Sequence, residues 1–173
     1  MTQVFSFEPP ERFVAGTVGV PGERTFFLQA RGSGRLVSVV LEKVQVTLLA
    51  QKLEELLAEA HRRFGVDVPE DADGDDNEPL DTPLDEEFRV GTLGLSWDGD
   101  TSTVVIEAIA VGEYEAEEPT EAELATLDRL RVRLTPAGTC ARATTGTAGK
   151  WTVCACSTTA PWRSRAGWSR RRT

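Results

Sequence analysis

The chain has 173 residues, 40% of them apolar and 27% charged, which is the composition of an ordinary soluble globular protein. No apolar run approaches the roughly 20 residues that span a bilayer. The first eight residues lack the basic and apolar regions of a secretory signal. These features predict one cytoplasmic domain of ordinary size and exclude a helical membrane protein.

Charge divides the chain at Asp128. All 28 acidic residues lie at or before this position, with 9 of the 19 basic residues, so the first 128 residues carry a net charge of −19. The last 45 residues carry +10 and all three cysteines. An acidic body lacks the clustered cations that specific nucleic-acid binding needs. An odd number of cysteines, all in the tail, predicts no disulfide framework.

The first part of the chain alternates apolar and polar residues between turn signals. Pro21-Gly22 is typical of a type II turn, and Gly32-Ser33-Gly34 is typical of a hairpin turn. The pattern predicts a short strand and then a three-stranded antiparallel meander. The expected strands cover residues 3–8, 13–20, 24–31 and 35–41.

A long helix is predicted over residues 43–64, ending at Gly65. Its apolar residues recur at spacings of mostly three and four, which gives one apolar stripe for packing on a sheet. The members of this stripe are Val46, Leu49, Leu53, Leu56, Leu57, Ala60 and Phe64. Residues 67–87 contain eleven acids and three prolines, which predicts a solvated, disordered linker.

The chain after the linker repeats the earlier order. Strands are predicted over residues 88–97, 103–111 and 130–134, with a hairpin turn at Asp98-Gly99-Asp100. Phe13-Val-Ala-Gly-Thr-Val-Gly-Val20 resembles Phe88-Arg-Val-Gly-Thr-Leu-Gly-Leu95, and later segments follow in the same order. We interpret this as a duplicated βββα unit, the alternative being a chance likeness of two meanders.

The predicted fold class is therefore α+β. We expect an antiparallel sheet of six to seven strands, with the helix over 43–64 on one face. Thr135-Pro136 is a strong helix start, yet the residues that follow are rich in Gly and Thr and carry no apolar stripe. The expected organisation is a single domain over residues 1–136, followed by a basic, disordered tail over 137–173.

Several of these segments carry a resemblance to a family. Residues 4–8, 10–19 and 24–30, with Phe88-Arg-Val-Gly-Thr92 and Val132-Arg-Leu-Thr-Pro136, are similar to an uncharacterised actinobacterial family catalogued as domain of unknown function 3090. The resemblance covers about residues 4–137. It implies the fold of that family and no assigned activity.

The resemblance also implies a C-terminal helix and a small zinc site built from a Cys-Pro-x-Cys segment with a later His and Cys. The tail does not reproduce this pattern: Cys140, Cys154 and Cys156 form no Cys-x-x-Cys pair, and no His follows them. The implied zinc site is therefore not carried over. An out-of-frame translation explains the tail composition best, the alternatives being a genuine basic tail and a cloning artefact.

No catalytic constellation, metal site or cofactor is predicted. His61 is expected on the exposed side of the helix, and Asp71 to Glu78 misses the Gly and Glu positions of a calcium loop. The tail cysteines lack a fourth zinc ligand. The glycines of the two meanders are expected to serve bulges or close packing.

The candidate pocket residues are Arg24, Gln29, Arg31 and Glu107. Gln29 and Glu107 occupy equivalent places in the two repeats, so they and the two arginines are predicted to line a pocket between the halves. The alternative is that they lie on the solvated face of the sheet.

Two functions follow from these features. The first is a non-enzymatic binding or adaptor protein with a protein partner, because a catalytic constellation is missing and a duplicated sheet offers a symmetric interface. The alternative is a metal-dependent (zinc) or small-molecule enzyme whose ligand-bearing C-terminal segment is missing from this chain. A third possibility is a non-functional product.

Overall fold

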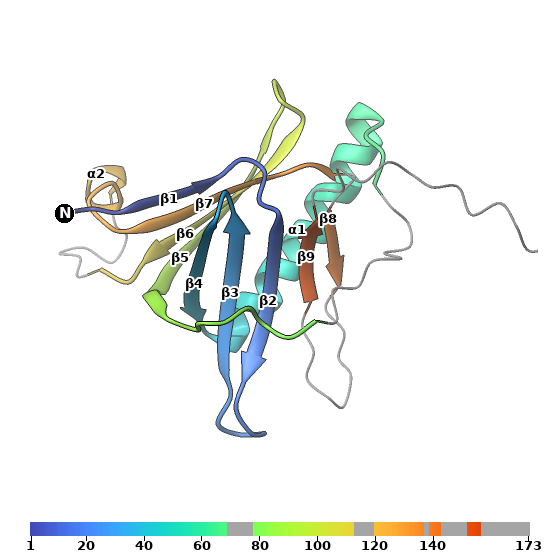
Figure 1. The fold of residues 1–173 in the computed structure, drawn as a ribbon. Helices are drawn as coiled ribbons and strands as arrows, with labels where there is room; N and C mark the ends of the chain where they lie inside the picture. The colour runs from blue at the N-terminus through green and yellow to red at the C-terminus, as the bar shows by residue number, and fades with distance from the viewer. Residues whose placement is uncertain (69–77, 113–119, 137–138, 143–151, 157–173) are drawn as a thin grey trace, which may run out of the picture.

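The computed structural model describes residues 1–68, 78–112, 120–136, 139–142 and 152–156. The helices are α1 (Lys43–Phe64) and α2 (Glu121–Leu124). The strands are β1 (Val4–Phe7), β2 (Arg12–Val18), β3 (Thr25–Gly32), β4 (Arg35–Leu41), β5 (Glu86–Asp98), β6 (Thr103–Ala110), β7 (Arg129–Leu134), β8 (Thr139–Arg142) and β9 (Thr152–Cys156). One sheet holds all of these strands in the order β1-β7-β6-β5-β4-β3-β2-β9-β8 (Figure 1). The α+β class is confirmed.

The sheet is mixed, so the prediction of a purely antiparallel sheet was wrong. The meanders β2–β3–β4 and β5–β6–β7 are antiparallel within themselves. They join through β4 and β5, which are parallel, and β1 adds to β7 in parallel as well. The reason is the long connection through α1, which returns the chain to the edge of β4 in the same direction.

Part of the tail belongs to the sheet. Seven strands come from residues 4–134, and β8 and β9 come from residues that we expected to be disordered. β9 pairs with β2 and β8 pairs with β9, because the free edge of β2 supplies backbone partners. No long helix follows β7 in the part of the tail that the structure describes, and the duplication of a βββα unit stays a prediction.

The helix α1 lies where the sequence predicts it, over Lys43–Phe64. Glu42 and Gln45 form a capping box at its start: Gln45 Oε1 accepts a hydrogen bond from the Glu42 backbone N–H at 2.8 Å. Gly65 ends the helix with φ 63°, and its N–H bonds the carbonyl of His61. This left-handed conformation favours glycine, so local sequence fixes both ends of α1.

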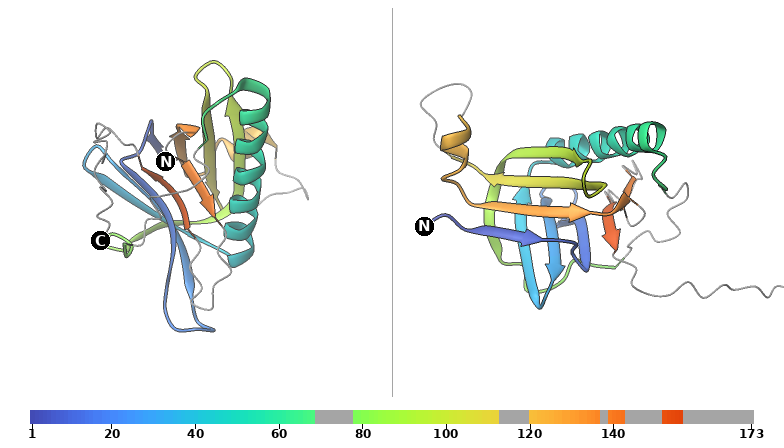
Figure 2. Two further views of the ribbon diagram at one scale, coloured as in Figure 1. Left: turned by 90° about the vertical axis from the view of Figure 1, so that its right-hand side faces the viewer. Right: turned by 90° about the horizontal axis from the view of Figure 1, so that it is seen from above.

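The core lies between α1 and one face of the curved sheet. Phe13, Leu28, Val39, Ile106 and Val132 come from five strands of both meanders and are all at most 1% exposed. The helix adds a buried stripe made of Val46, Leu49, Ala50, Leu53, Leu57 and Ala60. Figure 2 shows α1 beside β5, with β6, β7 and β1 following in turn.

The opposite face of the first meander is covered by residues 78–85, which we call the strap. In Figure 1 this green segment crosses in front of β4, β3 and β2, while α1 lies behind them. Leu80 packs so closely on Gly16 that a Cβ atom there would lie 2.8 Å from Leu80 Cδ2. The strap falls in the segment that we predicted to be a solvated, disordered linker. Residues 78–85 follow a defined path over the sheet, and five of the eight are exposed; residues 69–77 lie outside the described residues.

Candidate binding site

Two of the predicted pocket residues, Gln29 and Arg31, meet at the strap. Gln29 is 1% exposed on the outer face of β3. Its Oε1 accepts a hydrogen bond from the Asp81 backbone N–H at 2.9 Å, and its Nε2 donates to the Asp81 carbonyl at 2.9 Å and to Ser38 Oγ at 3.0 Å. Arg31 donates to Asp81 Oδ1 at 3.0 Å. The side-chain amide of Gln29 thus bonds both the N–H and the C=O of Asp81, as the backbone of a neighbouring strand would.

Arg12 is the third member of this cluster and was not predicted from the sequence. This arginine is 5% exposed. It donates to Asp81 Oδ2 at 2.9 Å and to the carbonyls of Glu78 and Pro79 at 3.3 and 3.1 Å. The register that places Arg12 opposite Arg31 could have indicated it, because two adjacent arginines on one sheet face need an acidic partner.

The hydrogen bonds around Asp81 join the strap to the first meander, and we call this cluster the lock. Arg12, Gln29 and Ser38 are buried, and each has hydrogen-bond partners within the protein. Buried polar groups that are fully paired stabilise one arrangement of the chain and leave little capacity for a ligand. The lock holds the strap on the outer face of the first meander.

Arg24 lies apart from the lock, at the opposite end of β3. It lines a pocket of about 240 Å³ together with Glu42, Lys43 and Arg89, which we call the cationic pocket. Arg89 Nη1 lies 2.7 Å from Glu42 Oε1. Three cations and one carboxylate therefore meet at the start of α1, and this pocket carries a net positive charge within an acidic body.

Glu107 lies on the second meander, away from both of these sites. It points to the outer face of β6, where its Oε1 lies 3.4 Å from Arg131 Nε of β7. Both side chains are about a third exposed, at 31% and 39%. The structure therefore brings Gln29 and Arg31 together, and none of the interactions between described residues joins Arg24 or Glu107 to them.

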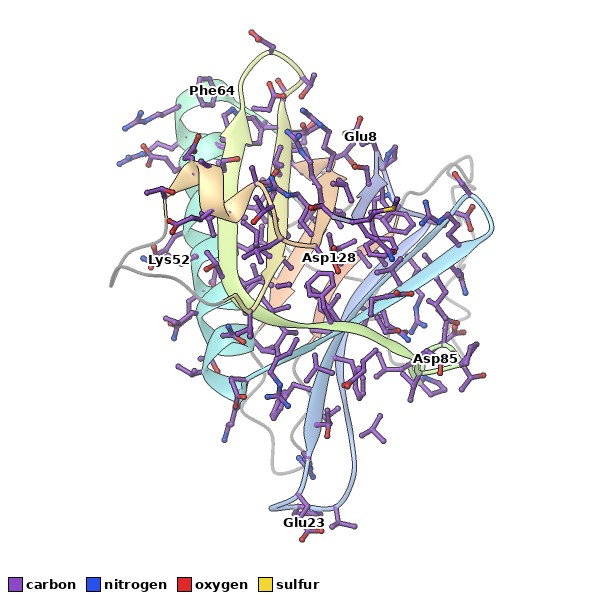
Figure 3. The ribbon with its side chains drawn as sticks, turned by 90° about the vertical axis from the view of Figure 1, so that its left-hand side faces the viewer. Glu8, Glu23, Lys52, Phe64, Asp85 and Asp128 are labelled. Carbon is purple, nitrogen blue, oxygen red and sulfur yellow. The ribbon has the colours of Figure 1, made fainter. Side chains whose placement is uncertain are left out.

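A mainly apolar concavity lies between α1 and β5, and we call it the α1–β5 groove. Its volume is about 340 Å³, and it is open to solvent. The lining residues are Gln45, Leu48, Leu49, Lys52, Gly91, Thr92, Leu93 and Leu95. Figure 3 shows Lys52 and Phe64 along α1, beside β5. Phe64 near the end of α1 stacks on Trp97 of β5, with ring centroids 5.9 Å apart.

An ion pair fixes the β5–β6 turn on the second meander. Arg133 donates to Asp98 Oδ2 at 2.5 Å, and the backbone N–H groups of Thr101 and Asp100 donate to Asp98 Oδ1. The Arg133 bond, followed by the Thr101 N–H bond, lowers the pKa of Asp98 from 3.8 to about 2. The carboxylate is therefore ionised at neutral pH and orders the turn.

Of the remaining titratable candidates, the structure describes the side chain of His61. His61 is exposed as predicted, and its Nδ1 lies 2.8 Å from the Val66 carbonyl oxygen. The acidic run from Asp71 to residue 77 and the side chains of the three cysteines lie outside the described residues. Among the side chains that the structure does describe, no group of three or more His, Cys, Asp or Glu could hold a metal ion.

The described helices include none that is both long and apolar enough to cross a membrane.

A family described as "Protein of unknown function (DUF3090)" matches residues 5–156. The chain belongs to this family. The match includes β8 and β9 and so extends beyond residue 137, where we expected the resemblance to end. Neither the curated proteins nor the solved structures contain a match to the chain.

Proposed function

We propose that this member of the family is a non-enzymatic binding protein and that the α1–β5 groove is its binding surface. The proposal rests on the contrast between the buried polar side chains of the lock and the exposed apolar side chains beside the groove. The buried polar groups of the lock bond to the strap, whereas apolar groups beside the groove remain open to solvent. A cytoplasmic location is part of the same proposal.

The exposed apolar residues of α1 support this surface. Val44 and Leu48 are 61% and 50% exposed, one helical turn apart, and Phe64 is 61% exposed. At 100° per residue, Val44 and Leu48 lie on the side of α1 away from the buried stripe, so α1 is apolar over more of its circumference than the core requires. Phe64 lies in line with the stripe at the end of the helix. Leu48 lines the groove together with Leu49, Leu93 and Leu95, and apolar residues that gather at a concave surface are typical of an interaction site.

The enzyme alternative has less support among the described residues. A zinc enzyme would depend on cysteine side chains that lie outside them. A small-molecule enzyme would need reactive polar groups facing an open cavity, and the lining of the α1–β5 groove offers only Gln45, Thr92 and Lys52 as polar side chains. Nucleophile and base pairs of the kind that acyl or phosphoryl transfer needs are not among these three residues.

A site-specific crosslinker tests the proposal. A photoreactive phenylalanine analogue replaces Leu48 in the full chain, expressed in its native host, and a matched variant carries it at Val20, which is 62% exposed in the turn after β2. We expect one protein to crosslink at Leu48 and not at Val20. That protein is then identified and purified, and its affinity is measured by calorimetry.

With the purified pair, Leu48→Glu should weaken binding at least tenfold, and Val20→Glu should leave it unchanged. Both variants should unfold at the temperature of the unmodified chain, since both side chains are exposed. Equal crosslinking at the two positions, or an affinity that Leu48→Glu does not alter, would overturn the proposal.

A further inference from the structure

One edge of β5 is without a strand partner over most of its length. On one side, β5 pairs with β6 from Val90 to Asp98. On the other side, the pairing with β4 ends at Arg89, because β4 stops at Leu41 and the chain enters α1. From residue 90 onward, no strand of the described residues pairs with the edge that faces α1.

The side chain of Gln45 occupies the beginning of this open edge. Its Nε2 donates to the carbonyls of Val90 and Gly91 at 3.2 and 3.3 Å. These bonds show that backbone acceptors of β5 point toward α1 at this place. Further along, Thr92, Leu93 and Leu95 line the α1–β5 groove, and the edge groups of residues 92–96 have no such substitute among the described residues.

The groove therefore combines two features that an extended chain recognises. The β5 edge offers backbone N–H and C=O groups, which pair with another strand. Leu48, Leu93 and Leu95 offer apolar contacts for alternate side chains of that strand. A helical or globular partner would leave the edge groups unpaired, so the surface favours an extended peptide.

Charge at one end of the groove defines the peptide further. The cationic pocket shares no lining residue with the groove, but both involve β5 and the start of α1: Arg89 lies two residues before Gly91, and Lys43 lies two residues before Gln45. Arg24, Lys43 and Arg89 are three of only nine basic residues among the first 128. Glu42 pairs with Arg89, whereas none of the hydrogen bonds or ion pairs between described side chains involves Arg24 or Lys43. A carboxylate is the complementary group.

We propose that the α1–β5 groove binds an extended peptide of another protein, which adds to the edge of β5 and places a carboxylate in the cationic pocket. This inference rests on the proposed function. The cationic pocket lies at the amino-terminal end of β5. A peptide that pairs antiparallel therefore ends at this pocket, so the carboxylate is its C-terminus or an acidic side chain close to it.

A peptide library displayed with free C-termini tests this inference on the full chain. We expect selected sequences to carry apolar residues two positions apart, followed by a carboxylate. A synthetic peptide from the selection should slow hydrogen exchange at backbone amides within residues 92–96 at least tenfold. Amidation of its C-terminus should weaken binding tenfold if the terminal carboxylate is the ligand; if an acidic side chain is the ligand, its amide analogue should do so instead.

Arg24→Gln should weaken binding of this peptide at least fivefold, because it removes one cation from the pocket. Arg62→Gln is the matched control, since Arg62 pairs with Glu59 on the exposed surface of α1 and lies outside both the groove and the cationic pocket. No selected sequence with this pattern, no protection within residues 92–96, or equal affinity of the two variants would overturn the inference.

The same experiments separate failure of this inference from failure of the proposed function. If the partner found at Leu48 binds as a helix, the exchange of residues 92–96 will not change; the binding function then stands and strand addition is wrong. If the library yields no binder and no partner crosslinks at Leu48, both are wrong.

Discussion

Gln29 and Glu107 occupy equivalent places in the two meanders and differ completely in environment. Each lies in the middle strand of its meander, on the face away from the core. Gln29 is 1% exposed and bonds to the strap, whereas the side chain of Glu107 is 31% exposed and pairs with Arg131. The difference arises from the strap, which crosses the first meander (Figure 1).

The strap, which lies outside the two meanders, therefore determines whether an outward-facing residue of a middle strand is buried or exposed. The same alternation that places Gln29 and Glu107 outward leaves either residue on a solvated face. Only the strap turns Gln29 into a buried residue that requires hydrogen bonds. Substituting Glu for Gln29 and Gln for Glu107 is therefore the most direct test of this difference.

Gln29→Glu should have the largest effect. A carboxylate at this position cannot donate to the Asp81 carbonyl or to Ser38, and it buries a charge, so we expect a loss of about 3 kcal/mol or more in the free energy of unfolding. Chemical denaturation measures this loss, and limited proteolysis should cleave the strap faster. A loss below 1 kcal/mol with an intact strap would mean that the lock does not hold the segment.

The glycines of the similar strands provide the second test. A Cβ atom at Gly91 would lie 2.9 Å from the Cα atom of Val111, whereas one at Gly16 would meet the side chain of Leu80. Because backbone yields less than a side chain, Gly91→Ala should cost about 2 kcal/mol and Gly16→Ala about 1 kcal/mol. Gly94→Ala, with 3.7 Å to the nearest atom, is the control and should change stability by less than about 0.5 kcal/mol.

A pH titration examines the second meander by itself. Because the pKa of Asp98 is lowered to about 2 in the folded chain, its ionised form stabilises the fold above pH 4, and this contribution is lost as the pH falls toward 2. NMR of the carboxyl carbon should give the low pKa directly. Arg133→Gln should raise it toward the ordinary value and flatten the stability curve between pH 4 and 2. An unchanged Asp98 pKa in this variant would exclude Arg133 as the main cause.

Glu107→Gln should have the smallest effect. The ion pair with Arg131 is partly exposed, and its distance of 3.4 Å lacks hydrogen-bond geometry, since Arg131 Nε has no hydrogen-bond partner. We expect a change below about 0.5 kcal/mol in the same denaturation experiment. A loss as large as that of Gln29→Glu would show that the outer faces of the two meanders are equally constrained.

Local patterns predicted most of the fold. The capping residues and the apolar stripe fix α1, and alternation with turn residues fixes β1 to β7 within a few residues. Pairing between distant segments was not predictable in this way. The parallel contact of β4 with β5 depends on where the chain returns after α1, and β9 depends on the free edge of β2.

The site was predicted less well than the fold. The composition of residues 67–87 predicts a solvated segment, because eleven acidic residues and only two leucines give a low mean hydropathy. The informative signal was positional: Leu80 lies next to Asp81, opposite a sheet face that carries Arg12 and Arg31. The α1–β5 groove was not predicted, because the sequence pattern indicates the strands but does not show that β5 extends beyond the end of its neighbour β4.

The strap also fixes the point at which the connection from α1 reaches the sheet. Val68 packs against the core, and the carbonyls of Glu78 and Pro79 bond to Arg12, so the structure holds both flanks of residues 69–77 in place. For a connection between two fixed points, doubling the number of residues costs only about 0.6 kcal/mol in closure entropy. Val68 and Glu78 are therefore fixed points between which a longer connection would be expected to cost little closure entropy.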